Sequence, residues 1–88
     1  PPLKHEIVGG HLSLWNGGLL LYHLVMAGFN CKKACVLRYG YNISVIIEKD
    51  SITIPGLSYD NGDIRKLLEF LPPGLNEPFN GDIWRLNW

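Results

Sequence analysis

The stretch that decides the fold reads GHLSLWNGGLLLYHLVMAGFNCKKACVLRYGYNISVIIEK, from Gly10 to Lys49. An apolar run of helical length comes first and stops at the triplet Ala27-Gly28-Phe29. Two runs rich in β-branched and aromatic residues follow, with Gly40 between them. This change in composition predicts an apolar helix followed by two strands.

The helix is expected to run from Gly17 to Ala27. The side chain of Asn16 suits the N-cap, and Gly28 can adopt the left-handed conformation that commonly ends a helix. Apolar residues occupy nearly every face of this helix, and Tyr22 and His23 are its polar side chains. A helix that is apolar all round is buried on more than one side. The sequence therefore predicts a partner for it, either an N-terminal domain or a second copy of the chain.

Strands are expected at Ala34–Tyr39 and Asn42–Glu48, where residues that favour strands predominate. Gly40 can take the positive φ that a tight connection requires, so the two runs are predicted to pair as an antiparallel hairpin. Residues 52–54 fit either a short third strand or an extended surface segment. The predicted fold is thus α+β, with the apolar helix packed on the hairpin.

The 88 residues are expected to form one small domain, because a chain of this length buries only roughly two thirds of its unfolded surface. Residues 1–10 are expected as an extended lead-in, residues 11–56 as the helix and hairpin core, and residues 57–88 as a second helix and an extended aromatic tail. That second, amphipathic helix would begin at Asp60 or Asn61 and end at Leu71. The predicted core comprises Leu20, Leu24, Ala27, Phe29, Val36, Ile43, Val45 and Ile47.

The composition is 47% apolar and 18% charged, below the ~25% charge typical of soluble domains, which suggests that part of the surface is covered. Eight basic residues balance eight acidic ones without clustering, so neither nucleic acid nor an anionic membrane is an expected partner. No apolar run approaches the ~20 residues that span a bilayer. With two cysteines and no disulfide framework, the chain is expected to be cytoplasmic, with both thiols reduced.

Four residues form the conceivable metal-binding set: His5, His11, Cys31 and Cys35. The Cys-x3-Cys spacing differs from the tight knuckle of structural zinc sites, so no metal site is predicted. Cys35 is instead expected to point into the sheet core, and Cys31 to lie in the loop between helix and strand. His23 is expected to be a hydrogen-bonded histidine at a domain boundary rather than a catalyst.

Six residues could line one edge of a pocket, or could equally cap a loop and pack the rim of the sheet: His11, Ser13, Trp15, Asn16, Tyr39 and Tyr41. Ser13 lies in no nucleophile-elbow pattern, and no glycine-rich phosphate loop is present. No nucleophile, base and orienting group occur together, which argues against a small hydrolase or a thiol-dependent enzyme. No catalytic residue can be assigned.

The order of motifs resembles the C-terminal part of a class I S-adenosylmethionine-dependent methyltransferase. Residues 10–49 carry this resemblance through Gly-His-x-Ser, an Asn-capped helix ending in Ala-Gly-Phe, a strand, Tyr-Gly-Tyr and a second strand. The resemblance implies a helix and hairpin that close the end of a Rossmann-like sheet. It also implies that His11, Ser13 and Trp15 lie on the substrate side of the cleft, because ligands of open α/β sheets bind beyond the C-terminal ends of the strands.

The cofactor-binding elements of that family are absent from this sequence: the glycine-rich loop after the first strand and the acidic residue that holds the ribose. The resemblance therefore implies a fragment that binds no cofactor and is not catalytically competent alone; S-adenosylmethionine would be held by a missing N-terminal half. The alternative is a stand-alone α+β interaction module that homodimerises. Its expected contact surface comprises Leu19, Tyr22, Met26, Phe79, Trp84 and Trp88, unless the tail folds back over the helix and buries both tryptophans.

Overall fold

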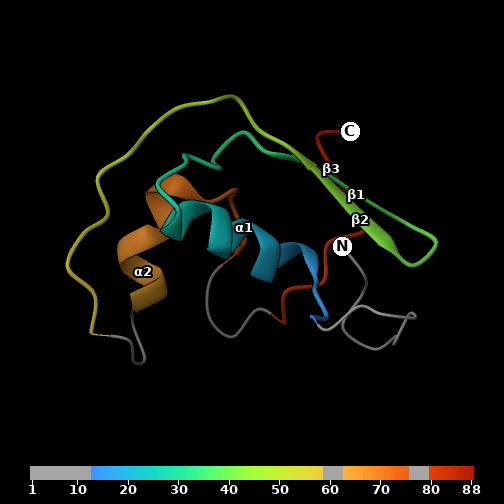
Figure 1. Cartoon of the computed structure of the whole chain (residues 1–88), viewed down its shortest axis with the longest axis horizontal. Coiled ribbons are helices and arrows are strands. Elements are labelled where there is room, and N and C mark those ends of the chain that lie inside the picture. The colour runs from blue at the N-terminus through green and yellow to red at the C-terminus, as the bar shows by residue number, and fades with distance from the viewer. Residues whose placement is uncertain (1–12, 59–62, 76–79) are drawn as a thin grey trace.

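The computed structural model describes residues 13–58, 63–75 and 80–88. These residues form a small α+β structure with a three-stranded antiparallel sheet, which confirms the predicted fold class. Figure 1 shows α1 between the sheet on one side and α2 on the other. The elements, in chain order, are α1 (Gly17–Met26), β1 (Cys35–Tyr39), β2 (Asn42–Ile46), α2 (Asp63–Leu67), the 3-10 helix η1 (Leu68–Phe70) and β3 (Arg85–Leu86).

Helix α1 begins and ends as its capping residues predict. The Asn16 side-chain oxygen accepts a hydrogen bond from the backbone N–H of Leu19 at 2.7 Å, which satisfies one free donor of the first turn. Gly28 has a φ of 99°, the left-handed conformation that stops the helix. The helix ends at Met26, one residue before the predicted Ala27. None of the described helices is long and apolar enough to cross a membrane.

The predicted hairpin is confirmed, with slightly shorter strands. β1 and β2 pair antiparallel, with Val36 opposite Val45, and a two-residue connection joins them in which Gly40 has a φ of 53°. Pairing starts at Cys35 opposite Ile46, not at Ala34, and does not extend to Glu48. The two segments diverge beyond this pair, so no further residues of the two segments pair as strands.

The C-terminal tail returns to the sheet, which the sequence did not indicate. β3 pairs antiparallel with β1, placing Leu86 opposite Val36, and the strand order is β2-β1-β3. The tail therefore folds back onto the sheet, and just before β3 it also contacts the first turn of α1, where the N–H of Gly18 donates to the carbonyl of Gly81 at 2.7 Å. Trp84 and Trp88 stay 66% and 43% exposed, so neither indole is buried.

The core joins α1, the hairpin and the segment after α2. Leu21 and Val25 of α1 are fully buried, whereas the predicted Leu20 and Leu24 are half-buried beside them. A helix that is apolar all round does not reveal from its sequence which stripe faces the sheet. Ala27 and Phe29 were wrong predictions: Ala27 follows the last helical residue and is exposed, and Phe29 is half-buried and does not join the core. The buried apolar residues are Leu21, Val25, Cys31, Ala34, Val36, Ile43, Leu67, Leu71 and Leu75; Val45 and Ile47 pack against them.

Residues 52–54 belong to an extended surface segment rather than a third strand. Phe29 and Ser51 form one isolated β-bridge, and the N–H of Ile52 donates to the carbonyl of Gly28 at 2.9 Å. The predicted caps of the second helix, Asp60 and Asn61, lie outside the described residues. The helix itself is shorter than predicted, because α2 gives way to η1 before the Pro72-Pro73 pair.

Candidate functional site

The residues predicted on the substrate side lie before the N-terminal end of α1. Ser13 is exposed and Trp15 is half-buried, whereas His11 lies outside the described residues. The ring of Trp15 meets the imidazole of His23 edge-on, with centroids 4.8 Å apart and an interplanar angle of 74°. The Nδ1 atom of His23 lies 2.9 Å from the carbonyl oxygen of Leu19. His23 is thus hydrogen-bonded, as predicted, and its imidazole contacts the Trp15 ring edge-on.

Asn16, Tyr39 and Tyr41 do not join this group through any contact among the described residues. Asn16 is 8% exposed, and both ends of its amide form hydrogen bonds. Its Oδ1 accepts from the N–H of Leu19, and its Nδ2 donates to the carbonyl of Asn80 at 3.1 Å. The hydroxyl of Tyr39 lies 2.9 Å from that of Ser44, on the hairpin. Asn16 therefore caps the helix, and Tyr39 and Tyr41 lie exposed at the rim of the hairpin, which was the alternative that the sequence left open.

Cys31 lies in the loop between α1 and β1, as predicted, but it is the buried thiol, whereas Cys35 does not point into the sheet core. Cys31 is fully buried, with its thiol near the carbonyls of Leu21 and Phe29, and burial raises the pKa of Cys31 to about 11. Cys35 is half-buried and pairs with Ile46 at the end of the hairpin. The prediction was wrong because Val36, not Cys35, takes the core-facing position at the start of β1, and alternate residues of a strand face opposite sides.

No three histidine, cysteine, aspartate or glutamate side chains gather into a metal-binding group in residues 13–58, 63–75 and 80–88. Both cysteines are free thiols. His5 and His11 lie outside these ranges, so the metal set considered from the sequence falls partly outside the described structure.

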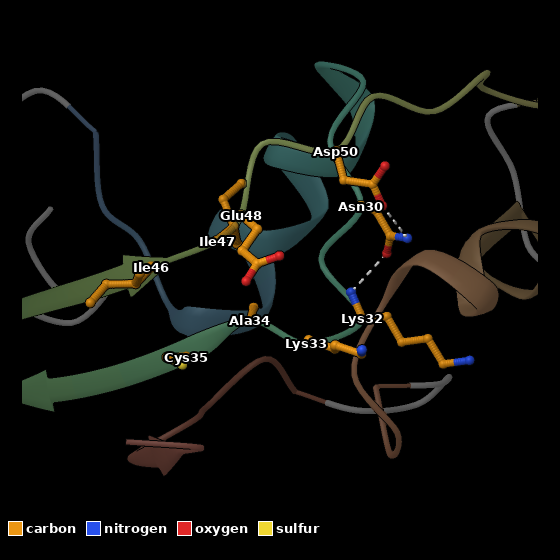
Figure 2. Close-up of a pocket in the computed structure, with 9 residues that line it drawn as sticks. All are labelled: Asn30, Lys32, Lys33, Ala34, Cys35, Ile46, Ile47, Glu48 and Asp50. Atoms are coloured by element: carbon orange, nitrogen blue, oxygen red, sulfur yellow. Dashed lines mark hydrogen bonds between the residues drawn. The ribbon is translucent and has the colours of Figure 1, made fainter.

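A cavity of about 410 Å³ opens at the end of the hairpin away from the Gly40 turn. Residues 30–35 and 46–50 line it, and Figure 2 shows Lys32 and Lys33 on one side, with Glu48 and Asp50 on the other. The two segments separate after the Cys35–Ile46 pair and meet again where the N–H of Asn30 donates to the carbonyl of Asp50 at 2.9 Å. The cavity is the opening between them.

Asn30 holds the two walls of this cavity together. Its Nδ2 donates to Oδ2 of Asp50 at 3.1 Å, and its Oδ1 accepts from the backbone N–H of Lys32 at 3.0 Å (Figure 2). The N–H of Ala34 donates to the carbonyl of Cys31 at 3.1 Å, which closes a turn with both lysines at its centre. The sequence did not indicate this site. The available signal was the charge pattern, since Lys32-Lys33 precedes the first strand and Glu48 to Asp50 follows the second.

No protein-family model, curated protein or solved structure matches this chain. Among the described residues, we consider two candidate regions: the Ser13 and Trp15 region before the first residue of α1, and the charged cavity lined by the loop after its last residue.

Proposed function

We propose that this chain is the C-terminal, substrate-side portion of a methyltransferase-like protein that uses S-adenosylmethionine and is not catalytically competent alone. The observation that carries the proposal is the order and packing of α1, β1 and β2. An Asn16-capped helix stopped at Gly28 is followed by an antiparallel hairpin that turns at Gly40, and the three share one core. This is the arrangement that the resemblance implies for the closing end of such a sheet.

The sheet has room for the remainder of a larger fold. Among the described strands, β2 pairs with β1 alone, so its outer edge remains open to a further strand. Open edges that are neither charged nor covered are uncommon in complete sheets, and the β2 sequence Asn-Ile-Ser-Val-Ile carries no charge. A preceding α/β half that pairs with this edge would supply the cofactor site, and both free thiols suit a cytoplasmic enzyme.

The chain's own contribution would be substrate contact through Trp15 and Ser13, with His11 beside them in the sequence. Trp15 offers a flat apolar ring whose orientation is set by the edge contact with His23. Ser13 is exposed and can donate or accept a hydrogen bond. In this assignment the Trp15 ring positions the substrate, and the methyl donor comes from the N-terminal half.

Calorimetric titration tests the proposal. The 88-residue chain should give no saturable heat with millimolar S-adenosylmethionine, whereas a polypeptide extended upstream to include a glycine-rich strand–loop–helix unit should bind it at micromolar concentration. In that longer protein, Trp15→Ala should raise the KM for the methyl acceptor, and Trp88→Ala, a surface control, should not. Micromolar binding by the isolated chain, or an upstream sequence without such a unit, would refute the proposal.

The second candidate is a stand-alone interaction module that homodimerises. The observation in its favour is the exposure of large apolar side chains: Trp84 is 66%, Trp88 43% and Leu19 41% exposed. Exposed apolar patches of several hundred Å² usually mark interfaces. Phe79, which the sequence placed in the same contact surface, lies outside the described residues. Sedimentation at ~100 µM, above a typical micromolar dissociation constant, should then give a dimer that Trp84→Ser weakens, whereas a monomer would exclude this candidate.

A further inference from the structure

We propose that the cavity between residues 30–35 and 46–50 binds a small aliphatic zwitterion. The ligand's carboxylate would lie against Lys32 and Lys33, and its ammonium group against Glu48 and Asp50. This site is separate from the Ser13 and Trp15 region and does not depend on the proposed methyltransferase function.

The charged side chains that line the cavity do not pair with one another. In the described part of the chain, the one ion pair joins Lys66 to Asp63, with Nζ 3.6 Å from Oδ1. Neither Lys32 nor Lys33 therefore comes within ion-pair distance of Glu48 or Asp50, although all four line the same opening (Figure 2). A ligand with one positive and one negative end can contact both walls at once, and each contact is an ion pair of the modest, exposed kind.

The space between the charged walls is apolar. Ala34 is 1% exposed, Ile47 is half-buried, and Ile46 presents a side chain that is 58% exposed. An aliphatic chain fits such a surface, because it removes the exposed carbons of Ile46 and Ile47 from water without leaving a polar group unpaired. The volume of about 410 Å³ lies within the range of sites for small molecules.

The walls are held in place before any ligand arrives. Asn30 links the two segments through its backbone and its side chain, and the N–H of Cys31 donates to the carbonyl of Phe70 at 2.8 Å. The turn that carries Lys32 and Lys33 is therefore anchored to the core at its start and to β1 at its end. A preformed site loses less conformational freedom on binding, which favours affinity.

Ligands of a single charge fit less well. The carboxylates of Glu48 and Asp50 would repel an anion placed beside the lysines, and the ammonium groups of Lys32 and Lys33 would repel a cation placed beside the carboxylates. Two carboxylates with two lysines nearby are also a poor set for a divalent metal, which prefers more oxygen ligands. The mixture of charges thus selects a ligand that carries both.

The test titrates the 88-residue chain with 6-aminohexanoate, followed by the NMR amide shifts of Lys33, Cys35 and Glu48. Binding should saturate in the millimolar range, as expected for two exposed ion pairs and a short apolar contact. Hexanoate and hexylamine, which have the same chain length and one charge each, should bind at least about threefold more weakly, the factor expected for one lost exposed ion pair. Equal binding of hexanoate, or shifts that never saturate, would overturn the proposal.

Variants separate the cavity from general surface charge. Lys33→Gln and Glu48→Gln should each weaken 6-aminohexanoate binding about threefold or more. Lys49→Gln is the matched control, because Lys49 lies between Glu48 and Asp50 in the sequence but does not line the cavity. An equal loss with Lys49→Gln would contradict the proposed site. The amide spectrum of each variant shows whether it is folded, and the Lys33→Arg variant, which retains the charge, should recover binding.

Discussion

The two faces of the β1–β2 hairpin differ in how they are used. On one face Val36 and Ile43 are 0% and 3% exposed and belong to the core with α1. On the other face Tyr39 and Ile46 are 51% and 58% exposed, and neither belongs to the core of the described residues. Both faces belong to the same two strands and carry residues that favour strands.

The difference shows that the hairpin is packed as one layer against one helix. Sheets of α/β proteins are covered by helices on both faces, and their strands are apolar on both sides. This hairpin has a mixed outer face, on which the polar Asn42 and Ser44 lie beside the apolar Ile46. The outer face is therefore where a further layer, a second copy of the chain or a ligand can be accommodated, and the charged cavity opens beside it.

The largest expected effect tests the two faces directly with isoleucines of one strand. Ile43→Ala should lower the free energy of unfolding by about 2–5 kcal/mol, since it removes buried carbons and leaves a cavity. Ile46→Ala should change it by no more than about 0.5 kcal/mol, as at other exposed positions. Urea unfolding followed by circular dichroism measures both. Similar losses at the two positions would show that the outer face is covered in solution.

The two cysteine thiols also differ in burial, as the two faces of the hairpin do. Because burial raises the pKa of Cys31 to about 11, only about one part in a thousand of this thiol is ionised at pH 8, and its thiolate is also shielded from reagent. Cys35 is half-buried beside the cavity, so iodoacetamide should modify it at least about a hundredfold faster than Cys31. Peptide mass spectrometry over time gives the two rates. The rate for Cys31 should rise as the pH approaches 11, and comparable rates at pH 8 would contradict the assigned burial.

A smaller effect is expected from the cap that holds α1 over the covered face. Asn16→Ala removes the hydrogen bonds to Leu19 and Asn80, and should cost about 1–2 kcal/mol of unfolding free energy. Ser13→Ala is the matched control, because Ser13 is exposed and makes no hydrogen bond among the described residues, so its effect should stay below about 0.5 kcal/mol. Thermal unfolding measures the stability of both variants. Equal melting temperatures would show that the cap is dispensable.

The smallest effect concerns the exposed tail. The guanidinium carbon of Arg38 lies 3.9 Å from the ring centroid of Trp84, a cation–π contact at the end of the sheet. Trp84→Ala should lower the free energy of unfolding by about 0.5–1 kcal/mol. Trp88→Ala should lower it less, because Trp88 accepts a hydrogen bond from Arg85 through its backbone carbonyl, which alanine retains. Chemical denaturation of the two variants distinguishes them. A larger loss for Trp88 would place its indole in a contact.

Much of the fold could be predicted because its signals are local. Asn16 caps α1, Gly28 ends it and Gly40 turns the hairpin, and each acts through the backbone within a few residues of its own position. The packing could not be predicted in the same way. Leu21 faces the core rather than Leu20, and Cys31 is buried rather than Cys35, because uniform apolarity leaves the direction of a helix or strand face undetermined.

The same distinction between local and tertiary signals applies to the candidate site residues. The resemblance indicated His11, Ser13 and Trp15, and the sequence predicted His23 as a hydrogen-bonded histidine. The contact between Trp15 and His23 required the structure. The charged cavity could not be predicted, since Lys33 and Glu48 are 15 positions apart and meet only because the hairpin folds and its two ends then diverge.

By itself the sequence determined the α+β class, the limits of α1 to within one residue and the antiparallel hairpin. Tertiary structure alone decided which helical stripe is buried, that β3 joins β1, and that two lysines and two carboxylates line one opening. The physical reason is the range of the interactions. Capping and turn formation depend on neighbouring residues, whereas burial and charge placement depend on which distant segments the folded chain brings together.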